Sequence, residues 1–300
     1  MYDVIIIGGG PAGLTAGIYA KRSNMKALIL EEKNIGGKII NASKIENYPG
    51  IESISGYDFS ISLYNQIKAL DIEIKMEKAI KIEESKNKKI IYTNKNKYET
   101  KSIIIAIGSK DKKINLEYED ELIGKGISYC ATCDGMFFKD KDVAIVGGGN
   151  SALYDALYLK DIVKNLYIIH RNSKFKADNE IIEKLKKCPN VNFITNTTIT
   201  KLIKKDNLKA IELTTNKEKR ILNIDGLFIR IGQTPNNIEI NNLKTDKIGY
   251  IKADETTKTN IKGIFVAGDI RTKSLRQIIT AIADAAVATK EAHKYINEVL

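Results

Sequence analysis

The stretch that decides the fold is Val4-Ile5-Ile6-Ile7-Gly8-Gly9-Gly10-Pro11-Ala12-Gly13, near the start of the 300-residue chain. Its four apolar residues are typical of a parallel strand that is buried on both faces. The glycines match the Gly-x-Gly-x-x-Gly fingerprint, in which they permit a tight turn, a close pyrophosphate and close helix–strand packing. A helix is expected over 14–22 and a strand over 27–30, followed by an acid that suits ribose hydroxyls. The predicted dinucleotide contacts are Gly8, Gly10, Pro11, Ala12, Gly13 and Glu31.

A second fingerprint of the same kind begins near the middle of the chain. A strand is expected over 143–146, and Gly147-Gly148-Gly149-Asn150-Ser151-Ala152 follows it, with alanine in the third small position. A helix over 153–159 and a strand over 166–169 complete the unit, and the helix N-terminus would face the phosphates. The sequence therefore predicts an α/β fold with two Rossmann-like, three-layer nucleotide-binding domains. The contacts predicted for the second nucleotide are Gly147, Gly149, Asn150, Ser151 and Ala152.

The two fingerprints end in side chains of opposite charge. The first ends in Glu31, which suits a free 2′-hydroxyl, and the second ends in His170 and Arg171, with Lys176 close behind. An acid repels a 2′-phosphate, whereas basic groups neutralise it. We therefore predict FAD at the first site and NADP(H) at the second, with His170, Arg171 and Lys176 near the 2′-phosphate.

Near the C-terminus, a predicted strand over 264–269 ends in Gly268 and Asp269. A turn is expected before it, over 231–236, and a long alanine-rich helix after it, over 275–296, with Ser274 as candidate N-cap. This order could place Asp269 on a ribityl hydroxyl and the helix N-terminus against a flavin ring.

Between the fingerprints lies Ser128-Tyr129-Cys130-Ala131-Thr132-Cys133-Asp134-Gly135. Two cysteines separated by two residues can close a small disulfide or share a metal ion. A thiolate that attacks a disulfide needs a proton source for the departing sulfur, and an acid directly follows the second cysteine. Metal knuckles do not need such an acid. The candidate catalytic residues are Cys130, Cys133 and Asp134.

Composition narrows the class of protein. The net charge of +11 raises the question of a nucleic-acid partner, but the lysines are scattered, tryptophan is absent, and no basic stretch interleaves with aromatics. No nucleic-acid partner is therefore expected. The chain contains no run of about 18 apolar residues, so no membrane span is expected. The N-terminus lacks the basic region and the cleavage site of a signal peptide. A cytoplasmic protein is expected, and paired cysteines there are more often catalytic or metal-binding than structural.

Together these motifs resemble the low-molecular-weight bacterial thioredoxin reductases, which are FAD-dependent pyridine nucleotide-disulfide oxidoreductases. The similarity covers nearly the whole chain and rests on the order of the motifs at 8–13, 45–50, 130–135, 147–152, 231–236, 267–269 and 275–278. It implies a homodimer in which an NAD(P)H domain, residues 113–241, is inserted into a FAD domain, residues 1–112 and 242–300. It adds to the FAD contacts Gly37, Asn47, Gly268, Asp269, Arg276, Gln277 and Ile278.

The resemblance also implies a mechanism. Hydride would pass from NADPH to FAD, and electrons would then pass to a Cys130–Cys133 disulfide. Cys133 would contact the flavin, Cys130 would attack the disulfide of thioredoxin, and Asp134 would donate a proton. One domain would rotate between two arrangements, through linkers near Lys112 and Asn241.

The chain departs from the family at the phosphate site. The family usually has His-Arg-Arg and then Phe-Arg, whereas here the residues are His170-Arg171-Asn172 and Phe175-Lys176. Lysine cannot make the bidentate fork that arginine makes with phosphate. A weaker preference for NADPH is expected, and two alternatives stay open: ferredoxin or NADH as the electron donor, and a different thioredoxin-like protein as the acceptor.

A structural zinc site is the non-catalytic alternative. Its ligands would be Cys130, Cys133, Cys188 and one of the two histidines, His170 or His293. Zinc needs four ligands from two knuckles, and nothing pairs with Cys188. We therefore predict that the chain holds no metal.

Overall fold

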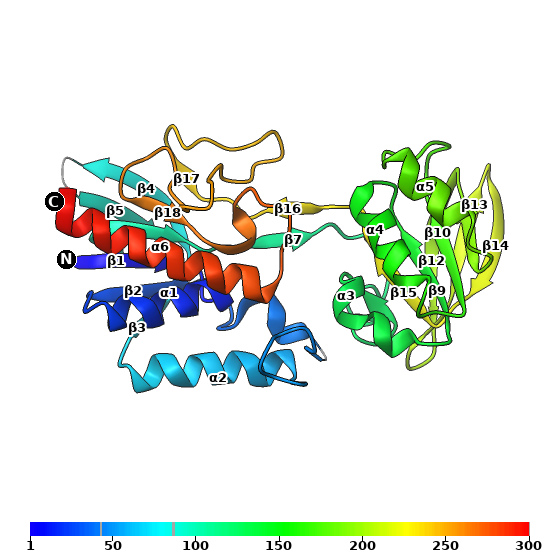
Figure 1. Cartoon of the computed structure of the whole chain (residues 1–300), viewed down its shortest axis with the longest axis horizontal. Helices are drawn as coiled ribbons and strands as arrows, with labels where there is room; N and C mark the ends of the chain where they lie inside the picture. The colour runs from blue at the N-terminus through cyan, green and yellow to red at the C-terminus, as the bar shows by residue number, and fades with distance from the viewer. Residues whose placement is uncertain (43, 86–87, 300) are drawn as a thin grey trace. The chain divides into compact units, whose positions relative to one another are not determined.

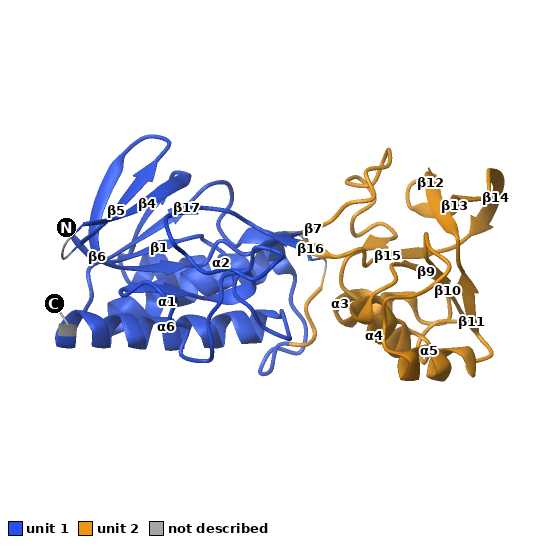
Figure 2. Ribbon diagram, turned by 90° about the horizontal axis from the view of Figure 1, so that it is seen from above, with its two compact units in different colours: residues 1–42, 48–110, 234–300 blue, residues 43–47, 111–233 orange. Residues whose placement is uncertain are grey.

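The computed structural model describes residues 1–42, 44–85 and 88–299, and the chain divides into two compact units (Figure 2). Unit 1 comprises Met1–Ala42, Tyr48–Lys110 and Thr234–Leu300, and unit 2 comprises Ser43–Asn47 and Asp111–Gln233. The sequence placed the changes of domain at 112/113 and 241/242. The compact units change at 110/111 and 233/234, where two short strands pair, and also at 42/43 and 47/48.

A sheet of eight strands forms the centre of unit 1 within the described residues. One of its inner strands, β1 (Tyr2–Ile7), pairs in parallel with β2 (Ala27–Glu31) and β6 (Lys97–Ile105). Val4 and the three isoleucines after it are buried, which confirms a strand covered on both faces. The other strands are β3 (Glu73–Met76), β4 (Ala79–Ser85), β5 (Lys88–Thr93), β17 (Glu239–Ile240) and β18 (Ile264–Val266). The order is β17–β4–β5–β6–β1–β2–β3, and β18 pairs with β6.

Helices α1 (Pro11–Arg22) and α6 (Ile278–Val299) lie side by side over one face of this sheet (Figure 1). α1 begins earlier than predicted because proline fits the first helical turn, where its missing N–H is not needed. α2 is the helix Gly56–Ala69, and Ser55 Oγ caps it by accepting the N–H of Asp58 at 3.0 Å. The short 3-10 turns are η1 (Gly37–Asn41) and η3 (Gly268–Ile270).

The predicted start of the C-terminal helix, with a helix over 275–296 and Ser274 as its N-cap, was wrong, because α6 begins at Ile278. The side chain of Arg276 gives the reason. Its guanidinium donates from Nε to the carbonyl oxygen of Asp269 at 3.2 Å. This bond folds the segment before α6 back onto η3 and keeps it out of the helix.

Unit 2 is built on a parallel sheet in the order β11–β10–β9–β15–β8. Its strands are β8 (Ile127–Ser128), β9 (Asp142–Val146), β10 (Asn165–Ile169), β11 (Val191–Ile194) and β15 (Gly226–Ile229). Its helical segments are α3 (Ala131–Asp134), η2 (Gly135–Phe138), α4 (Asn150–Leu159) and α5 (Asn179–Lys186). Unit 2 also contains an antiparallel sheet of β12 (Thr197–Lys204), β13 (Leu208–Thr215) and β14 (Glu218–Asn223).

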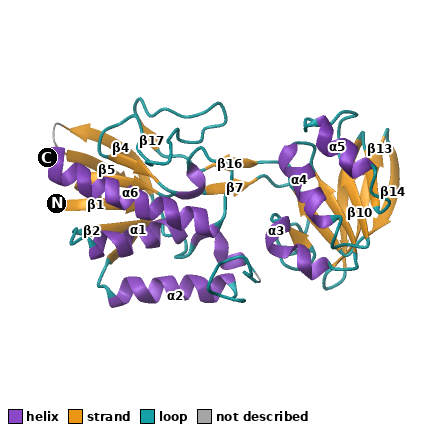
Figure 3. Ribbon diagram, viewed as in Figure 1, coloured by secondary structure: helices purple, strands orange, loops and turns teal. Residues whose placement is uncertain are grey.

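The three layers of unit 2 follow from alternation along its strands. On β9, Val143 and Ile145 are buried in one cluster with Leu153 of α4, and Ala144 between them is buried in another with Leu213 of β13. The parallel sheet therefore lies between helices and an antiparallel sheet (Figure 3). This arrangement agrees with the predicted Rossmann-like α/β class.

Two of the points at which the chain changes unit lie in β7 (Ser109–Asp111) and β16 (Gln233–Pro235), which pair as a two-stranded sheet. Gln233 donates from Nε2 to Asp111 Oδ1 at 2.6 Å, and the N–H of Lys112 donates to the carbonyl of Gly232 at 3.0 Å. The prediction of a simple turn over 231–236 missed this strand, because its pairing partner is distant in sequence. Among the described helices, none has both the length and the apolar composition needed to cross a bilayer.

Candidate active site

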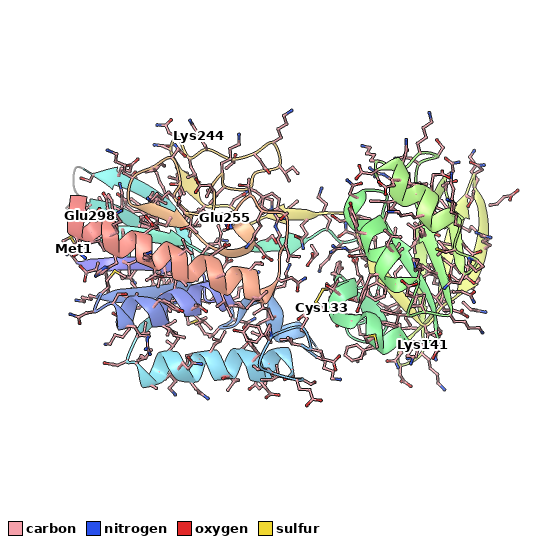
Figure 4. The ribbon with its side chains drawn as sticks, in the orientation of Figure 1. Met1, Cys133, Lys141, Lys244, Glu255 and Glu298 are labelled. Atoms are coloured by element: carbon pink, nitrogen blue, oxygen red, sulfur yellow. A yellow bond between two sulfur atoms is a disulfide. The ribbon has the colours of Figure 1, made fainter. Side chains whose placement is uncertain are left out.

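Cys130 and Cys133 form a disulfide in unit 2, with 2.10 Å between the sulfur atoms and 5.3 Å between the Cα atoms (Figure 4). The pair follows β8 and brackets the start of α3, and Thr132 Oγ1 lies 3.5 Å from Cys130 Sγ. The sequence allowed a disulfide or a shared metal, and the structure contains the disulfide. No group of three or more His, Cys, Asp and Glu side chains gathers as a metal site within the described ranges.

Asp134 is held beside the disulfide by Ser128. The Ser128 hydroxyl donates to Asp134 Oδ2 at 2.6 Å, and Oδ1 is buried with no hydrogen-bond partner within the described residues. Burial raises the pKa of Asp134 above its ordinary value, and the hydrogen bond from Ser128 offsets part of this rise. A carboxyl group that keeps its proton at higher pH is suited to act as a proton donor.

Tyr129, which precedes the first redox cysteine, is anchored at both ends. Its hydroxyl donates to Glu119 Oε1 at 2.5 Å, and its carbonyl accepts a hydrogen bond from Arg230 Nη1 at 2.9 Å. Glu119 is buried and also accepts the N–H groups of Ile114 and Asn115. Burial and the hydrogen bond to Glu119 raise the pKa of Tyr129. The backbone before Cys130 is therefore fixed by two side chains.

Arg230 links this backbone to the helix of the second fingerprint. Its Nε lies 2.6 Å from Asp155 Oδ2 on α4, an ion pair without the alignment of a hydrogen bond. The side chains are 23% and 14% exposed. Burial raises the pKa of Asp155, and Arg230 opposes that rise. Arg230 therefore contacts both the loop that carries the disulfide and the helix of the second fingerprint.

The first fingerprint combines two glycines that the fold requires with one that faces open space. Gly8 has a φ of +111°, and a Cβ there would collide with the carbonyl oxygen of Ala106. A Cβ on Gly13 would collide with the carbonyl oxygen of Gly8. A Cβ on Gly10, in contrast, would lie 3.9 Å from its nearest neighbour, the carbonyl oxygen of Gly36. This open position at the N-terminus of α1 is where a phosphate would approach.

Other predicted FAD contacts gather around this fingerprint. A Cβ on Gly37 would lie 3.2 Å from Gly10 Cα, and one on Gly268 would lie 3.1 Å from Ala12 Cβ. Glu31 accepts the N–H of Gly9 at 2.6 Å, so its carboxylate is held at the edge of the fingerprint. Segments that are distant in sequence therefore meet at the N-terminus of α1.

The Gly268 segment is fixed by a buried charge cluster that the sequence analysis missed. Asp284 on α6 accepts the N–H of Gly268 at 2.9 Å, Arg271 Nη2 at 2.8 Å and Lys273 Nζ at 2.6 Å. All three charged side chains are at most 7% exposed. Although burial acts to raise the pKa of Asp284, hydrogen bonds from Arg271 and Lys273 bring it below its ordinary value. The cluster thus holds the backbone of Gly268, directly before Asp269, beside Ala12 of α1.

The second fingerprint repeats the geometry of the first. A Cβ on Gly147 would collide with the carbonyl oxygen of Arg230, and Ala152 is buried. Gly149 has no heavy atom within 4 Å of a Cβ position and caps the N-terminus of α4. The N–H of Lys176 donates to the carbonyl of Gly148 at 2.7 Å, so this residue lies beside the fingerprint. Unit 2 therefore also offers open space for a phosphate at a helix N-terminus.

His170 has a different environment from the one expected for a phosphate contact. Its ring is stacked on Phe175 with 4.9 Å between centroids, lies over Gly148, and is 8% exposed. Burial lowers the pKa of His170, and Nε2 has no hydrogen-bond partner within the described residues. The His170 ring packs against Gly148 of the fingerprint, whereas the cationic side chains of Arg171 and Lys176 are exposed.

The remaining predicted contacts lie as follows. Pro11 starts α1, Ile278 starts α6 and Gln277 directly precedes it. Arg276 lies over the ring of Tyr250, 4.1 Å from its centroid. Asn47 falls in the segment that groups with unit 2. Asn150 is paired with Asp178, from whose N–H its Oδ1 accepts at 2.8 Å, and Ser151 is exposed in the first turn of α4.

Sequence reasoning missed Ser128, Glu119, Asp155, Arg230 and Asp284. One of them carried a visible signal, because Arg230 is a charged residue that directly follows the apolar strand β15. Buried charges are rare unless they are paired. The others are single polar residues whose partners are set only by the fold.

Residues 2–285 match the family model described as pyridine nucleotide-disulphide oxidoreductase. A thioredoxin reductase of Mycoplasma genitalium is 43% identical over 96% of this chain and 93% of its own length. One of Listeria monocytogenes is 39% identical over 99% and 95%. The crystal structure of thioredoxin reductase from Streptococcus pyogenes matches with a TM-score of 0.94 and 35% identity over 99% of this chain and 98% of that chain.

Proposed function

Because the chain belongs to the pyridine nucleotide-disulphide oxidoreductase family, we propose that it is a thioredoxin reductase that uses FAD and NADPH. The observation that carries the proposal is the Cys130–Cys133 disulfide, with Asp134 held beside it. The disulfide lies in the same unit as the fingerprint at Gly149. A thioredoxin or a thioredoxin-like protein is the proposed electron acceptor.

FAD is proposed to bind in unit 1. The open position at Gly10 and the N-terminus of α1 fit the pyrophosphate, and Gly37 and Gly268 bring further backbone beside it. Asp269 is proposed to bind a ribityl hydroxyl and Glu31 the ribose end of the cofactor. When bound, FAD supplies a two-electron carrier between the nicotinamide and the disulfide.

The residues of unit 2 are proposed to carry out thiol–disulfide exchange. In the reduced protein, the Cys130 thiolate attacks the disulfide of the acceptor and forms a mixed disulfide, while one acceptor sulfur departs. Asp134 donates a proton to that sulfur. Cys133 then attacks Cys130, which restores the disulfide of this chain and releases the second acceptor sulfur. Two electrons leave the cysteine pair, and the acceptor gains two thiols.

NADPH is the proposed donor, and its site would lie in unit 2. Gly149, Asn150 and Ser151 at the N-terminus of α4 would face the pyrophosphate, and Arg171 and Lys176 would bind the 2′-phosphate. Burial lowers the pKa of His170, so Arg171 and Lys176 are proposed as the two cations that neutralise that phosphate. NADH and ferredoxin are therefore retained as the alternative donors.

We further propose that β7 and β16 carry the rotation of one unit against the other, because two of the four points at which the chain changes unit, 110/111 and 233/234, lie in this pair. Residues near Lys112, in the predicted linker, fit this role. The second predicted linker, near Asn241, lies beyond β16 inside unit 1. A homodimer in the cytoplasm is proposed from the family resemblance.

An anaerobic titration tests the proposed function. NADPH and NADH are added in parallel to the yellow protein while the flavin absorbance is followed, with dithionite as control. Bleaching by NADPH, followed by recovery of the absorbance on addition of oxidised thioredoxin, is the expected result. Bleaching by dithionite and by neither nucleotide would overturn NADPH as donor and favour ferredoxin.

A further inference from the structure

Ser128 joins the backbone of the first redox cysteine to the acid that follows the second. Its hydroxyl donates to Asp134 Oδ2 at 2.6 Å and accepts the N–H of Cys130 at 3.0 Å. The side chain is buried, and its hydroxyl has one proton to donate. The carboxylate oxygen is a closer acceptor than the carbonyl oxygen of Cys130, which lies at 3.3 Å. The Ser128 proton therefore points to Asp134.

The two oxygens of the Asp134 carboxyl group are not equivalent. Oδ2 receives the Ser128 proton, whereas Oδ1 is buried and has no hydrogen-bond partner within the described part of the chain. A buried anionic oxygen without a donor is costly, and a proton on that oxygen removes the charge. When Asp134 is protonated, the proton is thus expected on Oδ1.

We propose that Ser128 is a positioning residue that fixes Oδ1 of Asp134 as the oxygen carrying the transferred proton. The proposal rests on the proposed function. In that reaction, Cys130 Sγ forms a bond to one acceptor sulfur, the acceptor S–S bond breaks, and the other sulfur leaves with the electron pair. The proton on Asp134 Oδ1 moves to this sulfur, which becomes a thiol, and Asp134 becomes a carboxylate that Ser128 stabilises through Oδ2.

Among the described residues, no charged side chain contributes to the pKa shift of Asp134. α3 packs against η2, which has no ionisable side chain, and against α4. The ionisable side chains of α4 are Tyr154, Asp155 and Tyr158, and Asp155 is paired with Arg230. Strands β8 and β15 contribute none. Burial, which raises the pKa of Asp134, is therefore opposed by Ser128 alone in this part of the chain.

The first test measures the titration of Asp134 by ¹³C NMR of labelled aspartate in the disulfide form of the FAD-loaded protein. Asp134→Asn identifies the signal. Ser128→Ala is expected to raise the pKa of Asp134, because the carboxylate loses a donor, and Ser128→Thr is expected to restore it. Ser62→Ala, on the exposed side of α2, is the matched control. An unchanged Asp134 titration in Ser128→Ala overturns the proposal, whether or not the protein reduces thioredoxin.

The second test compares two small disulfides as substrates of the dithiol form. The departing thiolate of an alkyl disulfide needs a proton, whereas that of an activated aromatic disulfide leaves without one. Ser128→Ala is expected to slow exchange with the alkyl disulfide by about tenfold and to change exchange with the aromatic disulfide by less than about twofold. In an Asp134→Asn background it is expected to cause no further loss.

Two outcomes separate this inference from the proposed function. Equal slowing of both disulfides, or a further loss in the Asp134→Asn background, would mean that Ser128 acts through the N–H of Cys130 and would overturn the inference alone. Alkyl exchange that is unchanged in Asp134→Asn would overturn the proposed acid itself, and the role of Ser128 with it.

Discussion

Arg230 donates a hydrogen bond, 2.9 Å long, to the carbonyl oxygen of Tyr129, the residue directly before the first redox cysteine. The same guanidinium is ion-paired with Asp155 on the helix of the second fingerprint. One side chain therefore contacts both the loop that carries the disulfide and the helix of the second fingerprint.

Replacement of Arg230 is expected to destabilise unit 2. Arg230→Met leaves Asp155 partly buried without its cation, at a cost of about 2–3 kcal/mol. Urea denaturation measures the loss, and Arg220→Met on the exposed strand β14 is the matched control. In Asp155→Asn the effect of Arg230→Met should be smaller. Additive losses would show that the two residues do not act as a pair.

Asp134→Asn is expected to slow thioredoxin reduction by about 10² or more, the usual contribution of a general acid. Reduction of the flavin by NADPH should be unchanged, because it does not use this carboxyl group. Stopped-flow absorbance separates the two steps, and Asp206→Asn in an exposed turn is the control. An equal loss in both steps would argue for a structural effect.

The raised pKa of Asp134 also fixes the pH dependence of this step. Below its pKa, Asp134 is protonated and can donate a proton. This ability is lost as the pH rises through the pKa. Because burial raises that pKa, donation should persist to a higher pH than an ordinary aspartate allows. The rate of alkyl disulfide exchange, corrected for the fraction of Cys130 thiolate, should therefore fall on the alkaline side. A corrected rate that is flat with pH would contradict the assignment.

Gly10→Ala and Gly13→Ala are expected to fail in different ways. A Cβ on Gly10 meets open space and its φ of −79° suits alanine, so the protein should fold but bind FAD about tenfold or more weakly. A Cβ on Gly13 collides with the carbonyl oxygen of Gly8, so this variant should be strongly destabilised. Thermal unfolding and FAD titration of the apoprotein distinguish them. Normal FAD affinity in Gly10→Ala would exclude a pyrophosphate at this position.

Arg171→Ala and Lys176→Ala should each raise the KM for NADPH by roughly tenfold, the equivalent of one charge-assisted hydrogen bond. The KM for NADH should not change, since NADH has no 2′-phosphate. Lys209→Ala, on the exposed side of β13, is the control. Parallel changes for both nucleotides would mean that these side chains do not contact the phosphate.

Asp284→Asn should destabilise unit 1 by about 3 kcal/mol at pH 7, because Arg271 and Lys273 lose their buried counter-charge. The pKa of Asp284 is lowered in the folded state, so its contribution is present above the unfolded pKa and is lost as the pH falls through the folded pKa. The difference in the free energy of unfolding between Asp284→Asn and the wild-type protein should therefore become smaller at acidic pH. Denaturation at several pH values tests this, with Glu52→Gln in an exposed loop as control. A difference independent of pH would contradict the linkage.

Much of the fold could be predicted from local patterns. The apolar run at Val4 and the spacing of Gly8, Gly10 and Gly13 fix a strand, a turn and a helix together, and β1 and α1 follow them closely. The Cys130–Cys133 disulfide was one of two options that the spacing allowed, and the structure contains it.

The rest depends on partners that are remote in sequence. Arg230 and Tyr129 are 101 positions apart, so no local pattern joins them. The bond from Arg276 to the Asp269 carbonyl delays the start of α6, although Ser274 resembles an ordinary N-cap. A strand as short as β16 exists only because β7 pairs with it. Such features follow from tertiary contacts, which override local propensity.

The pairing of β7 with β16 makes residues 111–233, the larger part of unit 2, a cassette, meaning a continuous segment whose two ends are adjacent. Asp111 and Gln233 are hydrogen-bonded, so the stretch 111–233 starts and finishes at neighbouring points. A closed module of this kind can be joined end to end, or exchanged between relatives at the two strands, with little added loop-closure entropy. Circular permutation inside the cassette should be tolerated for the same reason, provided that the new ends are placed in an exposed turn such as that between β13 and β14.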